Sequence, residues 1–182
     1  MELILASNSP RRKQILTENG FNFTVIPSSV IEPENIDKSP DKYAEFLAEL
    51  KATDVFNKNS GVVLGADTIV YLDGLILGKP KDKEDAIKTL KLLSNKTHVV
   101  CTGYAIISEN KKVISSEKTY VTFNKLSNEL ILDYVNSGLC MDKAGSYGIQ
   151  DGYPLVKEIK GDYQNVVGLP INKIKGILNE LL

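Results

Sequence analysis

The chain has 182 residues, of which 42% are hydrophobic and 25% are charged, and its formal net charge is -1. These are values of an ordinary globular protein, and a chain of this length can bury a core without disulfides or a structural metal. The near-zero net charge gives no reason to expect nucleic acid or an anionic membrane as a partner, so any phosphate site has to be built locally. We expect a single domain over residues 1–182, with two lobes as one form of it.

The cysteines and the N-terminal segment indicate the compartment. Cys101 and Cys140 are the two cysteines, and each lies beside apolar residues, which predicts buried thiols in a reducing compartment. The first residues lack the long apolar stretch of a signal peptide, and no apolar run approaches membrane-spanning length. We therefore expect a soluble, cytoplasmic protein.

The first predicted strand, Leu3–Ala6, runs directly into a helix start. Ser9 suits the N-cap, because its hydroxyl can accept from backbone N–H groups of the first turn. A helix N-terminus attracts phosphate, and the Ser7 and Ser9 hydroxyls add donors there. Arg11 and Arg12 add two permanent cations at the same point. The turn predicts a phosphate site, and the alternative is a capped surface helix with two solvated arginines.

The stretch up to residue 51 is expected to form a helix, a strand, a polar loop and a second helix. The expected ranges, in that order, are Lys13–Asn19, Phe21–Val25, Ser28–Lys38 and Pro40–Lys51. Gly20 is a favoured residue directly after a helix. In the second helix four apolar side chains recur at helical spacing, which predicts one buried stripe. They are Tyr43, Phe46, Leu47 and Leu50.

The rest of the chain mixes strands and helices. The expected strands are Val62–Leu72, Leu75–Leu77, Thr97–Ile107, Val113–Phe123 and Leu155–Ile159. The expected helices are Asp82–Leu93, a segment capped by Ser127 and closed by Gly138, and Ile171–Leu182. Asp73-Gly74 is a strong hairpin signal, so the strands that it joins are antiparallel. The pattern predicts an α/β fold with a mixed, twisted sheet flanked by helices.

Asp67 is a carboxylate inside an apolar strand. Such a group is costly to bury unless it is paired, hydrogen-bonded or bound to metal. One interpretation is a metal ligand or a general base at the end of a strand. The alternative is a core aspartate that is bonded to the local backbone or to Thr68.

Other candidate residues are weaker when taken one by one. Lys79 follows the hairpin and Glu32 lies in the polar loop, and each by itself fits a solvated surface charge. His98 has no partner at ligand spacing, which favours a structural role. Gln150 ends a glycine-rich segment, Lys143–Gln150. Its amide offers both a donor and an acceptor, so it could read a base, and the alternative is an ordinary turn.

Taken together, ordered segments along nearly the whole chain resemble the Maf family of nucleoside triphosphate pyrophosphatases, first named for inhibition of septum formation. The matching segments include Leu5–Arg12, Glu32, Gly65–Thr68, Gly78–Pro80, Asp142–Gln150, Gly161–Tyr163 and Asn165–Pro170. The sequence Ala-Gly-Ser-Tyr-Gly-Ile-Gln is similar to the branch that acts on dTTP and UTP. Asn95 stands where the family usually has glycine, and because asparagine tolerates left-handed backbone angles we expect that turn to persist.

The resemblance implies a fold and a reaction. The fold is a two-lobed mixed α/β architecture around a deep cleft, similar to the inosine triphosphatase (Maf/Ham1) group. The reaction is hydrolysis of dTTP and UTP, or of modified pyrimidine nucleotides, to the monophosphate and pyrophosphate, which would serve nucleotide-pool cleaning or cell-division arrest. Two rival readings are a non-catalytic nucleotide-binding regulator of septum formation and a nucleotidyltransferase. The second is disfavoured because Ser-Asn-Ser-Pro replaces the usual glycine-rich opening loop.

The resemblance also implies roles for residues. Glu32 and Asp67 are the expected ligands of Mg²⁺ or Mn²⁺, and Asp67 is the expected base, although the division of these roles stays open. The expected triphosphate contacts are Ser7, Ser9, Arg11, Arg12, Lys51 and Lys79. The expected selectivity residues are Arg11, Thr68 and Gln150. Apart from the nucleotide we expect no nucleic-acid or membrane partner, and a homodimer stays open.

Overall fold

The computed structural model describes residues 1–33 and 37–182, and its contacts divide the chain into two compact units. Unit 1 contains residues 1–68, 101–117 and 168–182, and unit 2 contains residues 69–100 and 118–167. The predicted loop Ser28–Lys38 is irregular where it is described, and its residues 34–36 lie outside the described part. Within the described residues, no helix is both long enough and apolar enough to span a membrane.

Each unit combines helices with strands, and three long strands contribute to both. Those strands are β3 (Val62–Leu72), β5 (Thr97–Ile107) and β6 (Lys112–Phe123). The other elements of unit 1 are β1 (Leu3–Leu5), α1 (Pro10–Glu18), β2 (Phe23–Val25), α2 (Pro40–Phe56) and α6 (Ile171–Leu181). The other elements of unit 2 are β4 (Leu75–Leu77), α3 (Lys83–Leu93), α4 (Asn128–Ser137), the 3-10 turn η1 (Ala144–Ser146), β7 (Val156–Lys160) and α5 (Tyr163–Val167).

The strands pair in the order β2-β1-β3-β5-β6-β7, and β4 pairs with β3 outside this path. Strand β1 is parallel to both β2 and β3, with Ile4 opposite Thr24 on one side and Val63 on the other. The β3–β4 and β6–β7 pairs are antiparallel, so the predicted mixed sheet is confirmed. Asp73 and Gly74 join β3 to β4 with φ angles of 51° and 82°, the positive values that a tight hairpin turn requires.

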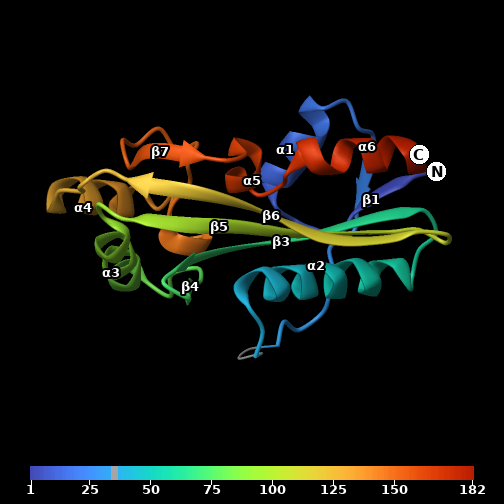
Figure 1. The fold of residues 1–182 in the computed structure, drawn as a ribbon, viewed down its shortest axis with the longest axis horizontal. Coiled ribbons are helices and arrows are strands. Elements are labelled where there is room, and N and C mark those ends of the chain that lie inside the picture. The colour runs from blue at the N-terminus through green and yellow to red at the C-terminus, as the bar shows by residue number, and fades with distance from the viewer. Residues whose placement is uncertain (34–36) are drawn as a thin grey trace. The chain divides into compact units, whose positions relative to one another are not determined.

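In unit 1, helix α2 lies on one side of the strands, and α1 and α6 lie on the other (Figure 1). Two glycines let α2 approach closely. A Cβ at Gly65 in β3 would lie 2.5 Å from the carbonyl oxygen of Ala48, and a Cβ at Gly103 in β5 would overlap the backbone of Ala44. Only glycine leaves room for a helix backbone at this range.

The close approach selects small side chains on the buried face of α2. The buried residues of this helix are Ala44, Leu47, Ala48, Ala52 and Val55. The predicted stripe was therefore wrong except at Leu47, because Tyr43, Phe46 and Leu50 are only half-buried. The predicted end at Lys51 was also wrong. The helix continues to Phe56, because the intervening residues include no glycine or proline and Ala52 and Val55 extend the buried face.

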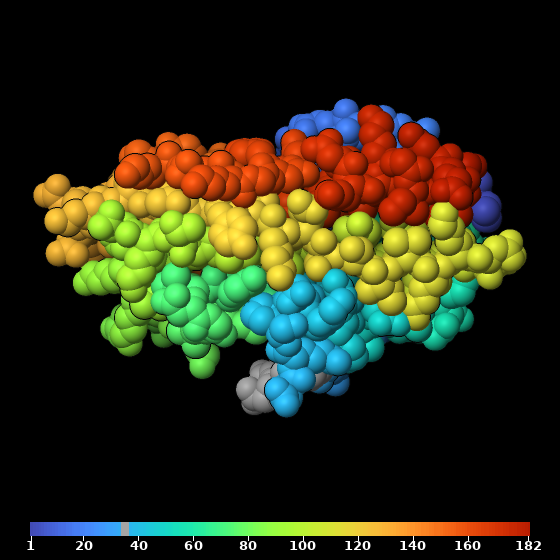
Figure 2. Space-filling model, viewed as in Figure 1, coloured from blue at the N-terminus to red at the C-terminus, as the bar shows by residue number. Residues whose placement is uncertain are grey.

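The first part of β6 lies at the surface of unit 1, where ion pairs join it to the helices on either side (Figure 2). Glu117 pairs with Lys173 of α6 at 3.6 Å, and Lys112 pairs with Glu49 of α2. Ser116 donates a hydrogen bond to Glu45 of α2 at 2.8 Å. Exposed pairs of this kind contribute little energy each, so the helices are held chiefly by their buried faces.

Unit 2 has its own apolar core. Ala86, Leu90 and Leu93 of α3 are fully buried, as are Thr119, Val121 and Phe123 of β6. Asn95 has a φ of 58°, so the left-handed turn that was expected of it is present. Cys101 in unit 1 and Cys140 in unit 2 are buried thiols, as predicted.

Candidate active site

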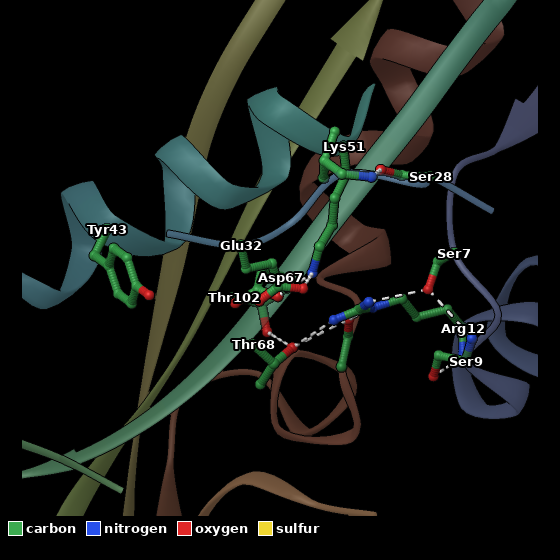
Figure 3. Close-up of polar contacts among 12 residues, drawn as sticks. Ser7, Ser9, Arg12, Ser28, Glu32, Tyr43, Lys51, Asp67, Thr68 and Thr102 are labelled. Atoms are coloured by element: carbon green, nitrogen blue, oxygen red, sulfur yellow. Dashed lines mark hydrogen bonds and ion pairs between the residues drawn. The ribbon is translucent and has the colours of Figure 1, made fainter. Parts of the chain in front are cut away.

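Three charged side chains meet on the face of β3 that α2 covers (Figure 3). The ammonium Nζ of Lys51 donates a hydrogen bond to Asp67 Oδ1 at 2.6 Å and lies 2.8 Å from Glu32 Oε1. The side chains of Lys51 and Asp67 are 16% and 14% exposed, whereas that of Glu32 is 48% exposed. The charge of Asp67 is thus balanced by a lysine from the neighbouring helix.

The loop that carries Glu32 is attached to α2 at two points. The backbone N–H of Ser29 donates to Asp54 Oδ2 at 2.9 Å, and the Tyr43 hydroxyl donates to the carbonyl oxygen of Pro33 at 3.1 Å. Hydrogen bonds from Lys58 and from the Ser29 backbone lower the pKa of Asp54 to about 2. The carboxylate is therefore charged at neutral pH and keeps its hold on the loop.

On the opposite face of β3, the guanidinium of Arg12 joins three segments of unit 1 (Figure 3). Its Nη1 donates to Ser7 Oγ at 3.1 Å, and its Nη2 donates to Thr68 Oγ1 at 3.0 Å. Its Nε donates to the carbonyl oxygen of Gly168 at 2.8 Å. Thr68 also shares a hydrogen bond of 2.9 Å with Thr102. Thr68 is therefore a partner of Arg12, whereas Asp67 is paired with Lys51.

The turn before α1 has the predicted cap geometry. Ser9 is the N-cap and its hydroxyl accepts from the backbone N–H of Arg12 at 3.4 Å, while Pro10 is the first helical residue. The Ser9 N–H itself donates to Ser7 Oγ at 3.2 Å. Arg11 is half-buried in this turn. Two serine hydroxyls and two guanidinium groups are therefore concentrated at one helix start.

The electrostatics of this region keep Arg12 cationic. Burial lowers the pKa of its guanidinium from the ordinary value, and the carboxylate of Asp67 opposes that shift. Arg11 lowers the pKa further and Glu32 raises it. An arginine pKa begins so high that the group stays charged at neutral pH. Glu32, Asp67 and Lys51 together carry one net negative charge. Arg11 and Arg12 supply positive charge beside them.

Two predicted residues, Lys79 and Gln150, belong to unit 2, and both are exposed. The loop that carries Gln150 is fixed by a buried polar network. The hydroxyl of Tyr134 donates to Asp151 Oδ2 at 2.6 Å and accepts from the backbone N–H of Gly148 at 2.9 Å. Lys143 Nζ lies 3.6 Å from the same Asp151 oxygen. Burial, followed by the hydrogen bond to Asp151, raises the pKa of the Tyr134 hydroxyl.

His98 lies in the core of unit 2, as its predicted structural role required. Its Nε2 shares a hydrogen bond of 2.7 Å with the hydroxyl of Tyr147, and its ring packs edge-on against Phe123. Burial lowers the pKa of His98 to about 4. Within the described part of the chain, its Nδ1 is buried without a hydrogen-bond partner. The imidazole is therefore neutral at physiological pH.

The structure brings together most of the residues predicted in unit 1. Glu32, Lys51 and Asp67 form one cluster, and Ser7, Arg12 and Thr68 form another. Two members of the second cluster were not singled out from the sequence, namely Thr102 and the carbonyl of Gly168. A threonine inside the apolar strand Thr97–Ile107 was the available signal for the first. A backbone carbonyl has no sequence signal.

The donor set of the first cluster fits a hard divalent cation. Glu32 and Asp67 direct carboxylate oxygens toward one point, and Mg²⁺ characteristically takes one or two carboxylates together with substrate phosphates. In residues 1–33 and 37–182, no group of three or more His, Cys, Asp or Glu converges on one position. A cation there would need water or substrate oxygens as its remaining ligands.

Comparison with known proteins gives a consistent result across the whole chain. The Maf family model, described as Maf-like protein, matches residues 2–181. A dTTP/UTP pyrophosphatase of Thermosipho africanus is 51% identical over 98% of this chain and 92% of its own. A dTTP/UTP pyrophosphatase of Bacillus pumilus is 50% identical over 97% of this chain and 95% of its own. One of Aquifex aeolicus is 48% identical over 100% of this chain and 96% of its own.

Solved structures support the fold. A Ham1 protein of Staphylococcus aureus matches with a TM-score of 0.57 at 13% identity, and a HAM1 protein of Coxiella burnetii matches with 0.54 at 18% identity. Each match covers 99% of both chains. At these identities the likeness concerns the fold alone, and it confirms the mixed α/β architecture of the Maf/Ham1 type.

Proposed function

Because the chain belongs to the Maf family, we propose that it is a pyrophosphatase that converts dTTP and UTP to the monophosphate and pyrophosphate. Relatives of about half identity are described as dTTP/UTP pyrophosphatases. The observation that carries the proposal is the cluster of Glu32, Lys51 and Asp67. It concentrates two carboxylates and one cation beside a helix start that is rich in donors, which suits hydrolysis of a phosphoanhydride.

In the proposed reaction Asp67 is the general base. A water oxygen forms a bond to the α-phosphorus while the phosphoanhydride bond between the α- and β-phosphates breaks. The proton of the water passes to Asp67, and pyrophosphate leaves. Without ligands the carboxylate lies 2.6 Å from the ammonium of Lys51, which keeps it charged and in place until the nucleotide enters. A positioned base of this kind typically accelerates proton transfer by about 10²–10⁴-fold.

The proposed phosphate contacts in unit 1 are Ser7, Ser9, Arg11, Arg12 and Lys51. Three of the five N–H donors of Arg12 are bonded to described residues, so part of its guanidinium already serves to hold the turn in place. Lys79 completes the proposed set, and its assignment rests on the family resemblance. The arginines and lysines of this set would neutralise charge that develops on the leaving pyrophosphate.

Glu32 and Asp67 are the proposed ligands of Mg²⁺ or Mn²⁺. When it is bound there, the cation supplies neutralisation of phosphate charge and makes a coordinated water more acidic. The remaining steps are carried by this chain's own residues. The proposed selectivity residues are Arg11, Thr68 and Gln150, and modified pyrimidine nucleotides are included in the proposed substrate class.

We further propose that residues 1–182 act as a single domain and that the enzyme works in the cytoplasm. The cleft and the homodimer stay predictions. Sedimentation of the purified chain with and without nucleotide would distinguish a monomer from a dimer.

The test is product analysis. The purified chain is incubated with Mg²⁺ and with dTTP, UTP, CTP or GTP, and both pyrophosphate and monophosphate are quantified. We expect equal amounts of the two products from dTTP and UTP. Nucleotide binding without turnover would instead support the regulator of septum formation, and release of orthophosphate would contradict the proposed bond cleavage.

A further inference from the structure

The ammonium of Lys51 lies where a bridging cation would lie. One atom, Nζ, is 2.6 Å from Asp67 Oδ1 and 2.8 Å from Glu32 Oε1. These are the two carboxylates that fit a divalent cation by their donor chemistry. A doubly charged ion that enters between them meets the like charge of the ammonium at contact distance, so it competes with Lys51 for the same oxygens.

The backbone of α2 holds the base of Lys51 in place, so only its side chain can leave. Ala48 and Ala52 flank Lys51 along the buried face of the helix and pack directly on Gly65 of β3. A lysine side chain has four flexible carbons and a compact charge, which lets the ammonium change partner without a movement of the helix. The side chain is 16% exposed, so the ammonium retains some access to solvent.

We infer that Lys51 is a placeholder cation that links metal binding to triphosphate binding at this site. Without ligands it neutralises Glu32 and Asp67. It releases them to a divalent cation when phosphate oxygens offer the ammonium a new anionic partner. The inference rests on the proposed function in one respect, namely that the incoming anion is a nucleotide triphosphate. By thermodynamic reciprocity, metal and triphosphate then strengthen each other's binding.

The experiment measures the two ligands separately, so that no turnover is needed. Mn²⁺ alone is titrated into the purified full chain, and the free ion is followed by its electron paramagnetic resonance signal. Binding of dTTP is measured by calorimetry in excess EDTA. The variant is Lys51→Met. The matched control is Lys111→Met, which removes a lysine that pairs with Glu180 at the surface of the same unit.

We expect Lys51→Met to bind Mn²⁺ about tenfold more tightly than wild type and dTTP about tenfold more weakly, within the usual range of linkage effects. Lys111→Met should match wild type in both measurements. The opposite signs are decisive, because a merely structural role for Lys51 would weaken both ligands together. If Lys51→Met is poorly folded by circular dichroism, Lys51→Gln serves as the second variant.

The remaining outcomes overturn the inference. Unchanged or weaker Mn²⁺ binding in Lys51→Met would show that the ammonium does not compete with the ion, and unchanged dTTP binding would show that it does not pass to phosphate. In either case, pyrophosphate release by wild type would still stand, and the proposed function with it. Mn²⁺ binding that is insensitive to Asp67→Asn would instead refute the proposed metal ligands.

Discussion

Each unit contains a partly buried carboxylate, and the two are held in different ways. In unit 1, Asp67 is balanced by Lys51, a flexible side chain that also holds Glu32. In unit 2, Asp151 accepts from Tyr134, and the same hydroxyl also accepts from the backbone N–H of Gly148. The carboxylate of unit 2 therefore fixes a loop, whereas that of unit 1 is held, within the described residues, by a lysine side chain.

The comparison separates a structural carboxylate from one that is proposed to react, although both side chains are largely covered. Asp67 and Asp151 have similarly low exposure, 14% and 7% for their side chains. What separates them is that Asp151, besides Lys143 at 3.6 Å, has a tyrosine partner that is itself bonded to the backbone. A carboxylate tied through a tyrosine to the backbone cannot exchange its partner without moving the chain, whereas one tied to a lysine can exchange it for a ligand.

The largest expected effect concerns the carboxylate that we propose as the base. Asp67→Asn should lower turnover of dTTP by at least about 100-fold, because it removes the proposed base and a proposed metal ligand together. The free energy of unfolding, measured in urea, should change by less than about 1 kcal/mol, since Lys51 keeps Glu32 as a partner. Glu180→Gln, which removes a surface carboxylate of the same unit, is the control. Near-wild-type turnover in Asp67→Asn would refute its assignment.

The next effect concerns the buried His98 of unit 2 and the pH dependence of the free energy of unfolding. The pKa of His98 is lowered from 6.5 to about 4 by burial, so the unfolded chain takes up a proton at higher pH than the folded chain. The contribution of the neutral His98 ring to the free energy of unfolding is present above pH 6.5 and is lost as the pH falls toward 4. The loss should amount to about 3 kcal/mol in the free energy of unfolding.

The measurement is urea unfolding at several pH values for wild type and for His98→Gln, whose amide can reach Tyr147 but does not titrate. His98 is the single histidine of the chain, so the difference between the two curves isolates it from the carboxylates. Parallel curves for the two proteins between pH 6.5 and 4 would show that His98 is not buried in its neutral form.

A smaller effect is expected at the structural carboxylate. Asp151→Asn should lower the free energy of unfolding by about 2 kcal/mol, because the charged acceptor of Tyr134 is lost. Turnover per folded molecule should fall less than at Asp67. Asp142→Asn is the matched control, because it removes an exposed partner of the same Lys143 and should cost less than about 1 kcal/mol. Equal destabilisation in both variants would break the distinction between the two kinds of carboxylate.

The smallest effect concerns selectivity at an exposed position. The Gln150 amide can pair with the donor and acceptor edge of thymine or uracil, and cytosine reverses that edge at C4. Wild type should therefore prefer dTTP and UTP over CTP by about tenfold in kcat/KM, and purines should be poor substrates. Gln150→Ala should lose this preference while the free energy of unfolding changes by less than about 0.5 kcal/mol. An unchanged ranking of dTTP, UTP, CTP and GTP would show that another residue reads the base.

Features with a local signal were predictable from the sequence. The cap at Ser9, the hairpin at Asp73-Gly74 and the buried face of α3 each depend on residues that are close in the chain. Asp67 was found because a carboxylate in an apolar strand is itself an anomaly. These signals arise from backbone geometry and burial, which act over a few residues.

Features that join distant segments were not predictable by spacing. The sequence does not indicate that Lys51 balances Asp67, or that the Arg12 guanidinium reaches the carbonyl of Gly168. The stripe of α2 was misassigned because the large apolar residues of a helix usually face the core. Here the glycines of the strands bring the helix so close that alanine takes that place.

This close contact has a consequence for the geometry of the site. Gly65 touches no proposed ligand, yet a Cβ there would lie 2.8 Å from the backbone nitrogen of Ala52, the residue directly after Lys51. Any side chain at position 65 would push the helix outward and carry the ammonium away from Asp67. The geometry of the site therefore depends on a glycine that takes no part in the proposed reaction. Glycine at positions 65 and 103 therefore serves the packing of α2 and, through it, the position of Lys51.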